Sequence, residues 1–267
     1  MERRIQKTVL TLVCIAALAP ATASAKQTAS TTITGAGSTL VAPLVSVWTQ
    51  PVDQAFGYQV QYSPVGSGGG ISAVTSRTAD FGASDAPLSP DQQAACHGCV
   101  QIPWALSATT VSYNLKGVPN ETGTGQKGNS GVAGAIANTD GAIGYISAAY
   151  TLTNHLPVAA VKNAAGVYAT PGLRGIAAAA ASVKKVPSDF HISIANPLKA
   201  ERHAYPISTF TYVIVPTQTP KANELRKFVF WAVTQGQKYG PKLIFAKLPK
   251  QVLAADEKAL TKIHSAT

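Results

Sequence analysis

The stretch YQVQYSPVGSGGGISAVTSRTADFGASDAPL, residues 58–88, decides the fold that we expect for this chain. Apolar residues alternate with glutamines over residues 58–62, which is the period of a half-buried strand. A glycine-rich run over residues 66–70 then leads into a short apolar helix. Residues 80–87, DFGASDAP, predict a second strand that ends in a turn carrying a carboxylate. Strands that alternate with helices indicate an α/β fold.

The glycine-rich run and the carboxylate together predict a site for an anion that still carries a proton. Backbone can approach a ligand closely at glycine because no Cβ intervenes. The following helix N-terminus presents unpaired N–H groups and a partial positive charge, which suit an anion. The carboxylate of Asp85 would repel a fully ionised anion, but it can accept a hydrogen bond from a protonated one.

A second strand–glycine–helix unit precedes this one. Residues 31–34 predict a strand and GAGS, residues 35–38, a turn. Ser38 or Thr39 can then cap a helix that has an apolar face. We expect this second helix N-terminus to face the same cleft as the glycine-rich run. Later strands are expected over 101–115, 141–146, 191–194 and 207–215, and helices over 131–137, 171–185, 221–239 and within 256–263.

The first 25 residues have the three parts of a secretory signal peptide. A basic start is followed by an apolar run over residues 8–20 and a small-residue cleavage site, Ala-Ser-Ala, over residues 23–25. The apolar run is shorter than the about 18 residues expected of a membrane-spanning helix. Cys14 lies inside that run without the small residues that precede a lipid-modified cysteine, so no lipoprotein anchor is expected. We therefore expect a cleaved, secreted or periplasmic protein.

The chain is basic, with 22 Lys and Arg against 12 Asp and Glu and a net charge of +10. Removing the predicted signal peptide, which holds three basic residues and one acidic residue, leaves +8. The lysines are dispersed over the later part of the chain and accompany no nucleic-acid-binding motif, so no nucleic acid is expected. The excess charge indicates a solvated basic surface, or one that attracts anionic wall polymers.

Two cysteines remain after processing, Cys96 and Cys99 in the sequence CHGC. In an exported protein this spacing favours a disulfide that closes a tight loop. A zinc site would need further cysteine or histidine ligands at suitable spacing, and only scattered histidines remain, so no metal is expected. A thioredoxin-like role is the least favoured alternative because no βαβ pattern surrounds the motif.

Enzyme signatures are weak, so we expect no catalytic residues, no cofactor and no enzymatic activity. The chain has no P-loop, zincin motif or G-x-S-x-G nucleophile elbow. The glycines in residues 123–128 fit G-x-G-x-x-G, but no clear strand precedes them and no acidic residue follows at the right distance. A hydrolase built on Ser67, Asp85 and a histidine stays an alternative without local support; the candidate histidines are His155, His191 and His203.

Several segments together resemble one family. GAGSTLVAPLVSVW (35–48) and GSGGGISAVTSRTADFGASDAPLS (66–89) are similar to the substrate-binding protein of the bacterial high-affinity phosphate ABC transporter, the PstS type. The resemblance continues in GQKGNSGVAGAIANTDGAIGYISAAY (125–150), AYPISTFTYVIV (204–215) and KFVFWAVTQGQKYG (227–240). It implies a two-lobed periplasmic-binding-protein (venus-flytrap) fold that closes on phosphate and delivers it to a membrane permease.

The resemblance also implies ligand contacts. Thr39 and Leu40 correspond to a loop offering a hydroxyl and backbone N–H groups, with Leu40 replacing a phenylalanine. Ser67 corresponds to a hydroxyl and N–H donor, and Asp85 to the carboxylate that takes the proton of hydrogen phosphate and so discriminates against sulfate. On this basis residues 26–104 and 206–267 form lobe I, and residues 105–205 form a reduced lobe II.

The chain departs from the family between residues 117 and 128, where a short, turn-rich linker replaces several dozen residues. The family has there an arginine followed by Ser-Gly-Thr that supplies phosphate contacts from lobe II. No such motif exists in this chain, so we expect a smaller lobe II and weaker binding. We therefore expect a monomeric extracytoplasmic protein that binds inorganic phosphate for an ABC permease. The alternative is a secreted, non-transport protein whose basic surface binds anionic wall polymers.

Overall fold

The computed structural model describes residues 30–114, 125–199 and 201–266. Six strands form one sheet in the order β2–β1–β3–β8–β4–β5. β1 pairs in parallel with β2 and β3, whereas β8, β4 and β5 run antiparallel to their neighbours. The strands are β1 (Thr31–Gly37), β2 (Tyr58–Ser63), β3 (Phe81–Ser84), β4 (Cys99–Asn114), β5 (Ala142–Ser147) and β8 (Ser208–Pro216), with a separate pair β6 (Val161–Lys162) and β7 (Tyr168–Ala169).

The helices are amphipathic or short and pack against this sheet. In α1 the buried residues Leu44, Val45 and Trp48 recur at helical spacing, as the sequence pattern predicts. Each such side chain contributes about 1.5–3 kcal/mol when fully buried. The helices are α1 (Ala42–Phe56), α2 (Ser67–Thr75), α3 (Pro90–Ala95), α4 (Gly128–Asn138), α5 (Ala148–Thr153), α6 (Leu173–Ala181), α7 (Ala222–Val233) and α8 (Lys250–Leu260), with 3-10 turns η1 (Gln235–Tyr239) and η2 (Pro241–Leu243).

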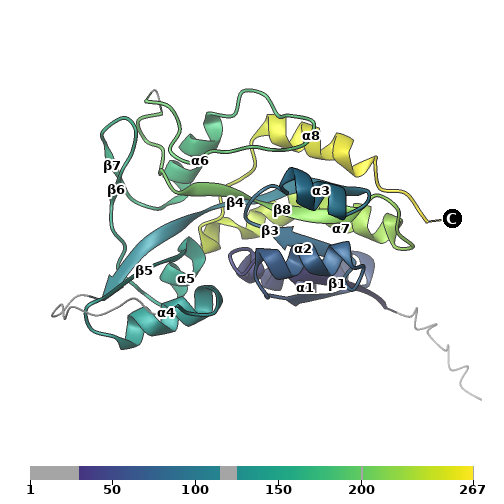
Figure 1. Ribbon diagram of the computed structural model, residues 1–267, viewed down its shortest axis with the longest axis horizontal. Helices are drawn as coiled ribbons and strands as arrows, with labels where there is room; N and C mark the ends of the chain where they lie inside the picture. The colour runs from purple at the N-terminus through teal and green to yellow at the C-terminus, as the bar shows by residue number, and fades with distance from the viewer. Residues whose placement is uncertain (1–29, 115–124, 200, 267) are drawn as a thin grey trace, which may run out of the picture.

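The 16-residue strand β4 connects two parts of the molecule (Figure 1). Its first part pairs with β8 in the larger body that contains β1–β3, and its last part, from Thr109, pairs with β5 beside α4 and α5. One cluster of buried residues nevertheless includes Leu44 of α1, Phe228 of α7 and Ile176 of α6. The lobe boundaries given above therefore stay a prediction.

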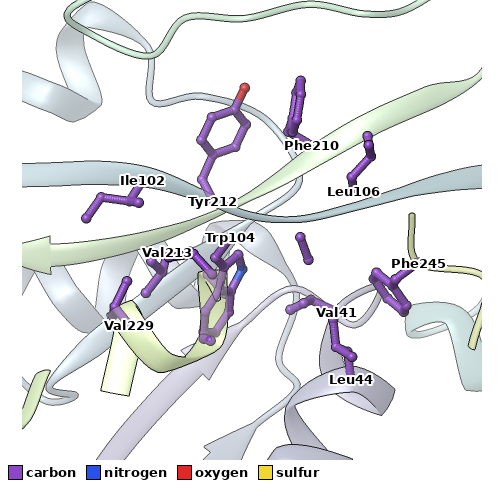
Figure 2. Close-up of a cluster of buried hydrophobic side chains, with 14 of the residues drawn as sticks. Val41, Leu44, Ile102, Trp104, Leu106, Phe210, Tyr212, Val213, Val229 and Phe245 are labelled. Atoms are coloured by element: carbon purple, nitrogen blue, oxygen red, sulfur yellow. The ribbon is translucent and has the colours of Figure 1, made fainter. Parts of the chain in front are cut away.

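The centre of the core is aromatic. Trp48 of α1 and Trp104 of β4 pack edge to face with their ring centroids 5.4 Å apart, and Phe81 of β3 lies 5.7 Å from Trp104. Figure 2 shows Trp104 together with aliphatic side chains from β4, β8, α1 and α7. The indole N–H of Trp48 donates to the carbonyl of Gly236 at 2.9 Å, which ties α1 to η1.

Four local expectations are wrong. The glycine-rich run is the first turn of α2, which begins at Ser67, rather than a loop before the helix. The turn expected over residues 35–38 begins only after Gly37, because β1 continues to that residue. Residues 191–194 form no strand. The strand over residues 141–146 is expected from its apolar residues to be buried, but in β5 the side chains of Ile143 and Tyr145 are 68% and 77% exposed, because β5 is an edge strand with one open face.

The cysteines of CHGC form the expected disulfide between Cys96 and Cys99. Arg77, at the end of α2, holds this loop: its guanidinium donates to the carbonyls of Val74 at 2.6 Å and Cys96 at 2.9 Å. The disulfide therefore closes the loop before β4, and Arg77 fastens that loop to the C-terminal end of α2.

Within residues 30–114, 125–199 and 201–266, no helix is long and apolar enough to cross a membrane. The same part of the chain contains no group of three or more histidine, cysteine, aspartate or glutamate side chains placed to hold a metal ion. The predicted signal peptide lies outside the described residues.

Asp256 of α8 is fully buried, and its two carboxyl oxygens have no hydrogen-bond partner among the described residues. Burial raises the pKa of Asp256 to about 9, and the neighbouring Glu257 adds to the shift. An aspartate in the unfolded chain has a pKa of about 4, so between these values the folded state binds more protons than the unfolded state. The free energy of unfolding should therefore fall as the pH rises through this range, by up to about 1.4 kcal/mol per pH unit.

We expect Asp256→Asn to remove this pH dependence, because an amide of the same size does not ionise. The variant should be more stable than the wild type near neutral pH, and the difference should shrink as the pH falls toward about 4. Urea unfolding at several pH values measures the difference in the free energy of unfolding between the variant and the wild type. Asp53→Asn, which removes a carboxylate from an exposed position of α1, is the matched control and should follow the wild type. Parallel profiles for wild type and Asp256→Asn would contradict the expectation.

Candidate functional site

Three parallel strands end side by side and bring their following residues together. Gly37 of β1 pairs with Ala83 of β3, and Ser38 and Asp85 follow shortly after these residues. β2 pairs with the other edge of β1 and leads into Ser67, the first residue of α2. In α/β sheets, ligands bind in the crevice outside the carboxyl ends of the parallel strands. The fold therefore collects these polar residues where a ligand site is expected.

Asp85 is the centre of this cluster. One carboxylate oxygen accepts a hydrogen bond from the Ser38 hydroxyl, and the other accepts from the Ser67 hydroxyl at 3.3 Å. The backbone N–H of Asp85 donates back to the Ser67 oxygen at 3.1 Å, and Thr209 of β8 donates to the Asp85 carbonyl at 3.0 Å. We call Ser38, Thr39, Ser67 and Asp85 the cradle. Sequence reasoning expected Ser67 near Asp85, and the structure joins them.

Burial raises the pKa of the Asp85 carboxyl above its ordinary value, and hydrogen bonds from Ser38 and Ser67 oppose the shift. The carboxylate is thus held where ionisation is costly and where a partner that brings a proton is favoured.

Close packing of α2 against the sheet sets the position of Ser67. A Cβ on Gly70 would lie 2.5 Å from the carbonyl oxygen of Ala36 and 2.9 Å from that of Ala83. Only a residue without a side chain allows this approach. The first turn of α2 consequently lies directly on β1 and β3, which brings the Ser67 hydroxyl to Asp85.

Thr39 and Leu40 make contacts of two kinds. The Thr39 hydroxyl accepts from the amide of Asn129, at the start of α4, at 2.7 Å. The side-chain amide oxygen of Asn129 accepts from the backbone N–H of Ser147 at 2.6 Å, so Asn129 links the segment before α1 to the end of β5. The N–H of Leu40, expected to face a ligand, instead donates to the Ser38 hydroxyl at 3.0 Å. Leu40 itself is buried.

Sequence reasoning missed three members of this neighbourhood. Ser38 was considered only as a helix cap, although it donates to Asp85. Tyr62 donates through its hydroxyl to the carbonyl of Ser38 at 2.8 Å, and Asn129 holds Thr39. Asn129 lies in the segment GQKGNSG that carries the resemblance, which was the one available signal for it. Tyr62 carries no signal beyond strand alternation, because its contact is with backbone.

A sheet of parallel strands whose carboxyl ends hold polar side chains defines the class of α/β ligand-binding proteins. Within this class the chain belongs to the PBP superfamily, because the model of the PBP superfamily domain matches residues 22–121 and 107–235. The expected periplasmic-binding-protein fold is therefore confirmed.

The PstS resemblance is confirmed over most of the chain. The phosphate-binding protein PstS of Xylella fastidiosa (strain Temecula1) is 26% identical, over 86% of this chain and 85% of its own length. PstS of Pasteurella multocida is 24% identical, over 86% and 90%. The alignment with the Xylella protein spans 312 positions but uses 86% of 267 residues, about 230, so roughly 80 positions face no residue of this chain.

Solved structures share the fold. A high-affinity periplasmic phosphate-binding protein with bound phosphate, PfluDING, aligns with a TM-score of 0.64 and 19% identity, over 83% of this chain and 92% of its own. A putative phosphate ABC transporter substrate-binding protein from Clostridium perfringens, also with bound phosphate, aligns with a TM-score of 0.60 and 13% identity. The alignment covers 82% of this chain and 100% of that protein.

Proposed function

We propose that this protein is an extracytoplasmic solute-binding protein that binds inorganic phosphate in the cradle. The observation that carries the proposal is the partly buried carboxylate of Asp85, joined to the hydroxyls of Ser38 and Ser67 at the ends of three parallel strands. The relatives named above are phosphate-binding proteins, which supports phosphate as the ligand. These relatives are named for binding rather than for catalysis, and we propose no enzymatic activity.

The cradle accounts physically for a choice between phosphate and sulfate. Near neutral pH hydrogen phosphate keeps one P–O–H group, which can donate to the Asp85 carboxylate. Sulfate has no proton there, so it would meet the carboxylate with like charge and an unsatisfied acceptor. Serine and threonine hydroxyls and the N-termini of α1 and α2 supply the opposing donors to the remaining phosphate oxygens.

This chain should bind phosphate more weakly than the family pattern implies, because it offers fewer hydrogen-bond donors to the ion. The chain has no arginine followed by Ser-Gly-Thr, and an arginine can hold phosphate through two parallel hydrogen bonds. Every 1.4 kcal/mol lost weakens binding about tenfold. In this proposal Asn129 of α4, within the predicted reduced lobe II, supplies part of the contact that the missing motif would make, and lobe I and the reduced lobe II close on the ion.

The proposal includes export and delivery. The predicted signal peptide would direct the chain across the membrane, and PfluDING, which shares its fold, is described as periplasmic. We propose that the processed protein acts as a monomer and delivers phosphate to an ABC permease. Separation of cell fractions, with detection of the cleaved N-terminus, tests export.

Calorimetric titration of purified, phosphate-free protein with phosphate, and in parallel with sulfate, tests the ligand. We expect saturable phosphate binding near neutral pH and none with sulfate at the same concentrations. The proposal is wrong if the protein binds no phosphate although circular dichroism shows that it is folded. Salt-sensitive retention on anionic wall polymer without phosphate binding would favour the alternative of a basic, polymer-binding secreted protein.

A further inference from the structure

Ser38 differs from the other residues of the cradle because it is completely buried. Its exposed fraction is 0%, whereas Thr39, Ser67 and Asp85 are each partly exposed. An ion seated in the cradle can contact those three side chains, but it cannot reach the Ser38 hydroxyl directly. Any effect of Ser38 on the ligand must therefore pass through the Asp85 carboxylate, to which its hydroxyl donates.

The hydrogen bonds around the Ser38 hydroxyl fix the direction of its proton. Its oxygen accepts from the backbone N–H groups of Leu40 at 3.0 Å and Val41 at 3.3 Å. A hydroxyl has two acceptor lone pairs and one proton, so these two donors occupy both lone pairs. The proton is donated to Oδ1 of Asp85. A protonated Oδ1 would find no free lone pair on Ser38, so this arrangement requires an ionised oxygen at that position.

Backbone hydrogen bonds hold Ser38 in this place. Its N–H donates to the carbonyl of Ala83 in β3 at 2.9 Å. Its own carbonyl accepts from the hydroxyl of Tyr62 in β2 at 2.8 Å. Ser38 is therefore fixed from two strands, and little freedom remains for its hydroxyl to turn away from Asp85.

The two carboxylate oxygens of Asp85 have different surroundings. Oδ1 receives the Ser38 proton, whereas Oδ2 accepts a long hydrogen bond of 3.3 Å from Ser67. The Ser67 hydroxyl is partly exposed at the first turn of α2, so it can turn its proton toward a bound anion. Oδ2 is then free to accept the proton of hydrogen phosphate.

We infer that Ser38 is a positioning residue that sets the selectivity of the cradle, because it keeps Oδ1 of Asp85 ionised and leaves Oδ2 for the proton of the ligand. Without the Ser38 hydroxyl, Asp85 takes up a proton more readily and can then donate to a fully ionised anion such as sulfate. This inference rests on the proposed function, because it concerns the same phosphate site. It adds the means by which that site keeps sulfate out.

The groups around Asp85 allow a pH profile to isolate this effect. Burial raises the pKa of Asp85, and the hydrogen bonds from Ser38 and Ser67 oppose the shift. Among the residues that the structure describes, the titratable side chain that interacts with Asp85 is Tyr62, whose pKa burial also raises, so it stays neutral below about pH 8. The remaining contact is the hydroxyl of Thr209 in β8, which does not ionise in this range.

The test is calorimetric titration of the full protein with sulfate, and in parallel with inorganic phosphate, from about pH 5 to about pH 8. Sulfate keeps its charge over this range, and Asp85→Asn, which cannot ionise, gives the baseline. We expect sulfate binding by Ser38→Ala to appear about one pH unit higher than in the wild type, because a tenfold change in the ratio of neutral to ionised carboxyl corresponds to one unit. Ser38→Gly should behave alike, and glycine is tolerated at helix starts with little loss of stability.

Ser112→Ala is the matched control. Ser112 of β4 is also completely buried, and its hydroxyl shares a hydrogen bond with Thr110 of the same strand, outside the contacts of the cradle. Its removal should lower stability without moving the sulfate profile. A purely structural role for Ser38 would give the same result in the Ser38 variants.

The ¹³C resonance of the Asp85 carboxyl, assigned by comparison with Asp85→Asn, gives a second readout that needs no ligand. In phosphate-free wild type this carboxyl should be ionised at about pH 7 in spite of its burial, and it should titrate at higher pH in the Ser38 variants. The wild-type spectrum alone tests the inference if neither variant folds.

The outcomes separate the inference from the proposed function. A folded Ser38 variant that binds phosphate with the sulfate profile of the wild type overturns the inference and leaves the proposed function standing. A protonated Asp85 carboxyl in the wild type at about pH 7 also overturns the inference, because Ser38 then has no ionised acceptor. A folded wild type that binds no phosphate overturns both.

Discussion

Asp85→Asn should reduce the preference of the protein for phosphate over sulfate by ten- to hundredfold. The substitution replaces an ionised acceptor with a neutral amide of the same shape, whose NH₂ group can donate to sulfate. A hydrogen bond to a charged group contributes about 1.5–3 kcal/mol, which corresponds to about one to two powers of ten in affinity. Phosphate should bind more weakly and sulfate should become detectable. Paired titrations with the two anions measure the ratio.

Asp91→Asn is the control for this prediction. It removes the same charge from an exposed position in α3, outside the contacts of the cradle, and should leave the ratio unchanged. The fold should survive Asp85→Asn, because the variant removes a partly buried charge whose ionisation burial opposes. If the ratio is the same in Asp85→Asn and wild type, the carboxylate does not select the ligand.

Gly70→Ala should destabilise the protein and weaken phosphate binding together. The added Cβ would lie 2.5 Å from both the Ala36 carbonyl oxygen and the Gly37 Cα, and 2.9 Å from the Ala83 carbonyl oxygen. All three are backbone atoms within β1 and β3, so α2 must move off the sheet. Overpacking of this kind typically costs about 1–3 kcal/mol. Movement of α2 also separates the Ser67 hydroxyl from Asp85, which should lower phosphate affinity. Urea unfolding and calorimetry measure the two effects.

Gly68→Ala is the matched control, two residues earlier in the same helical turn. Nothing lies within 4 Å of the position that its Cβ would take. Alanine has a better helix propensity than glycine by about 0.5–1 kcal/mol, so Gly68→Ala should be neutral or slightly stabilising. Equal stability of the Gly68→Ala and Gly70→Ala variants would contradict the close packing of α2 that we describe.

Local pattern was sufficient for much of the fold. The alternation of β2 and the apolar spacing of α1 predict elements that the structure contains, because burial on one face imposes these periods on the sequence. Residues 191–194 show the limit of this reasoning. Their apolar residues Ile192 and Ile194 are buried in the core, yet no neighbouring strand pairs with them. Burial and strand pairing leave the same local signal, and only the tertiary structure separates them.

The features of the cradle also fall into those that local sequence predicts and those that only the tertiary structure shows. Residue types close together in the chain predict the α/β class, the resemblance to PstS, and the pairing of a glycine-rich run with the carboxylate of Asp85. Only the tertiary structure decided that Ser38 donates to Asp85 and that Asn129 holds Thr39 from α4. Those partners lie 47 and 90 residues apart, and they meet because parallel pairing of β1 with β3 and the course of β4 bring distant segments together.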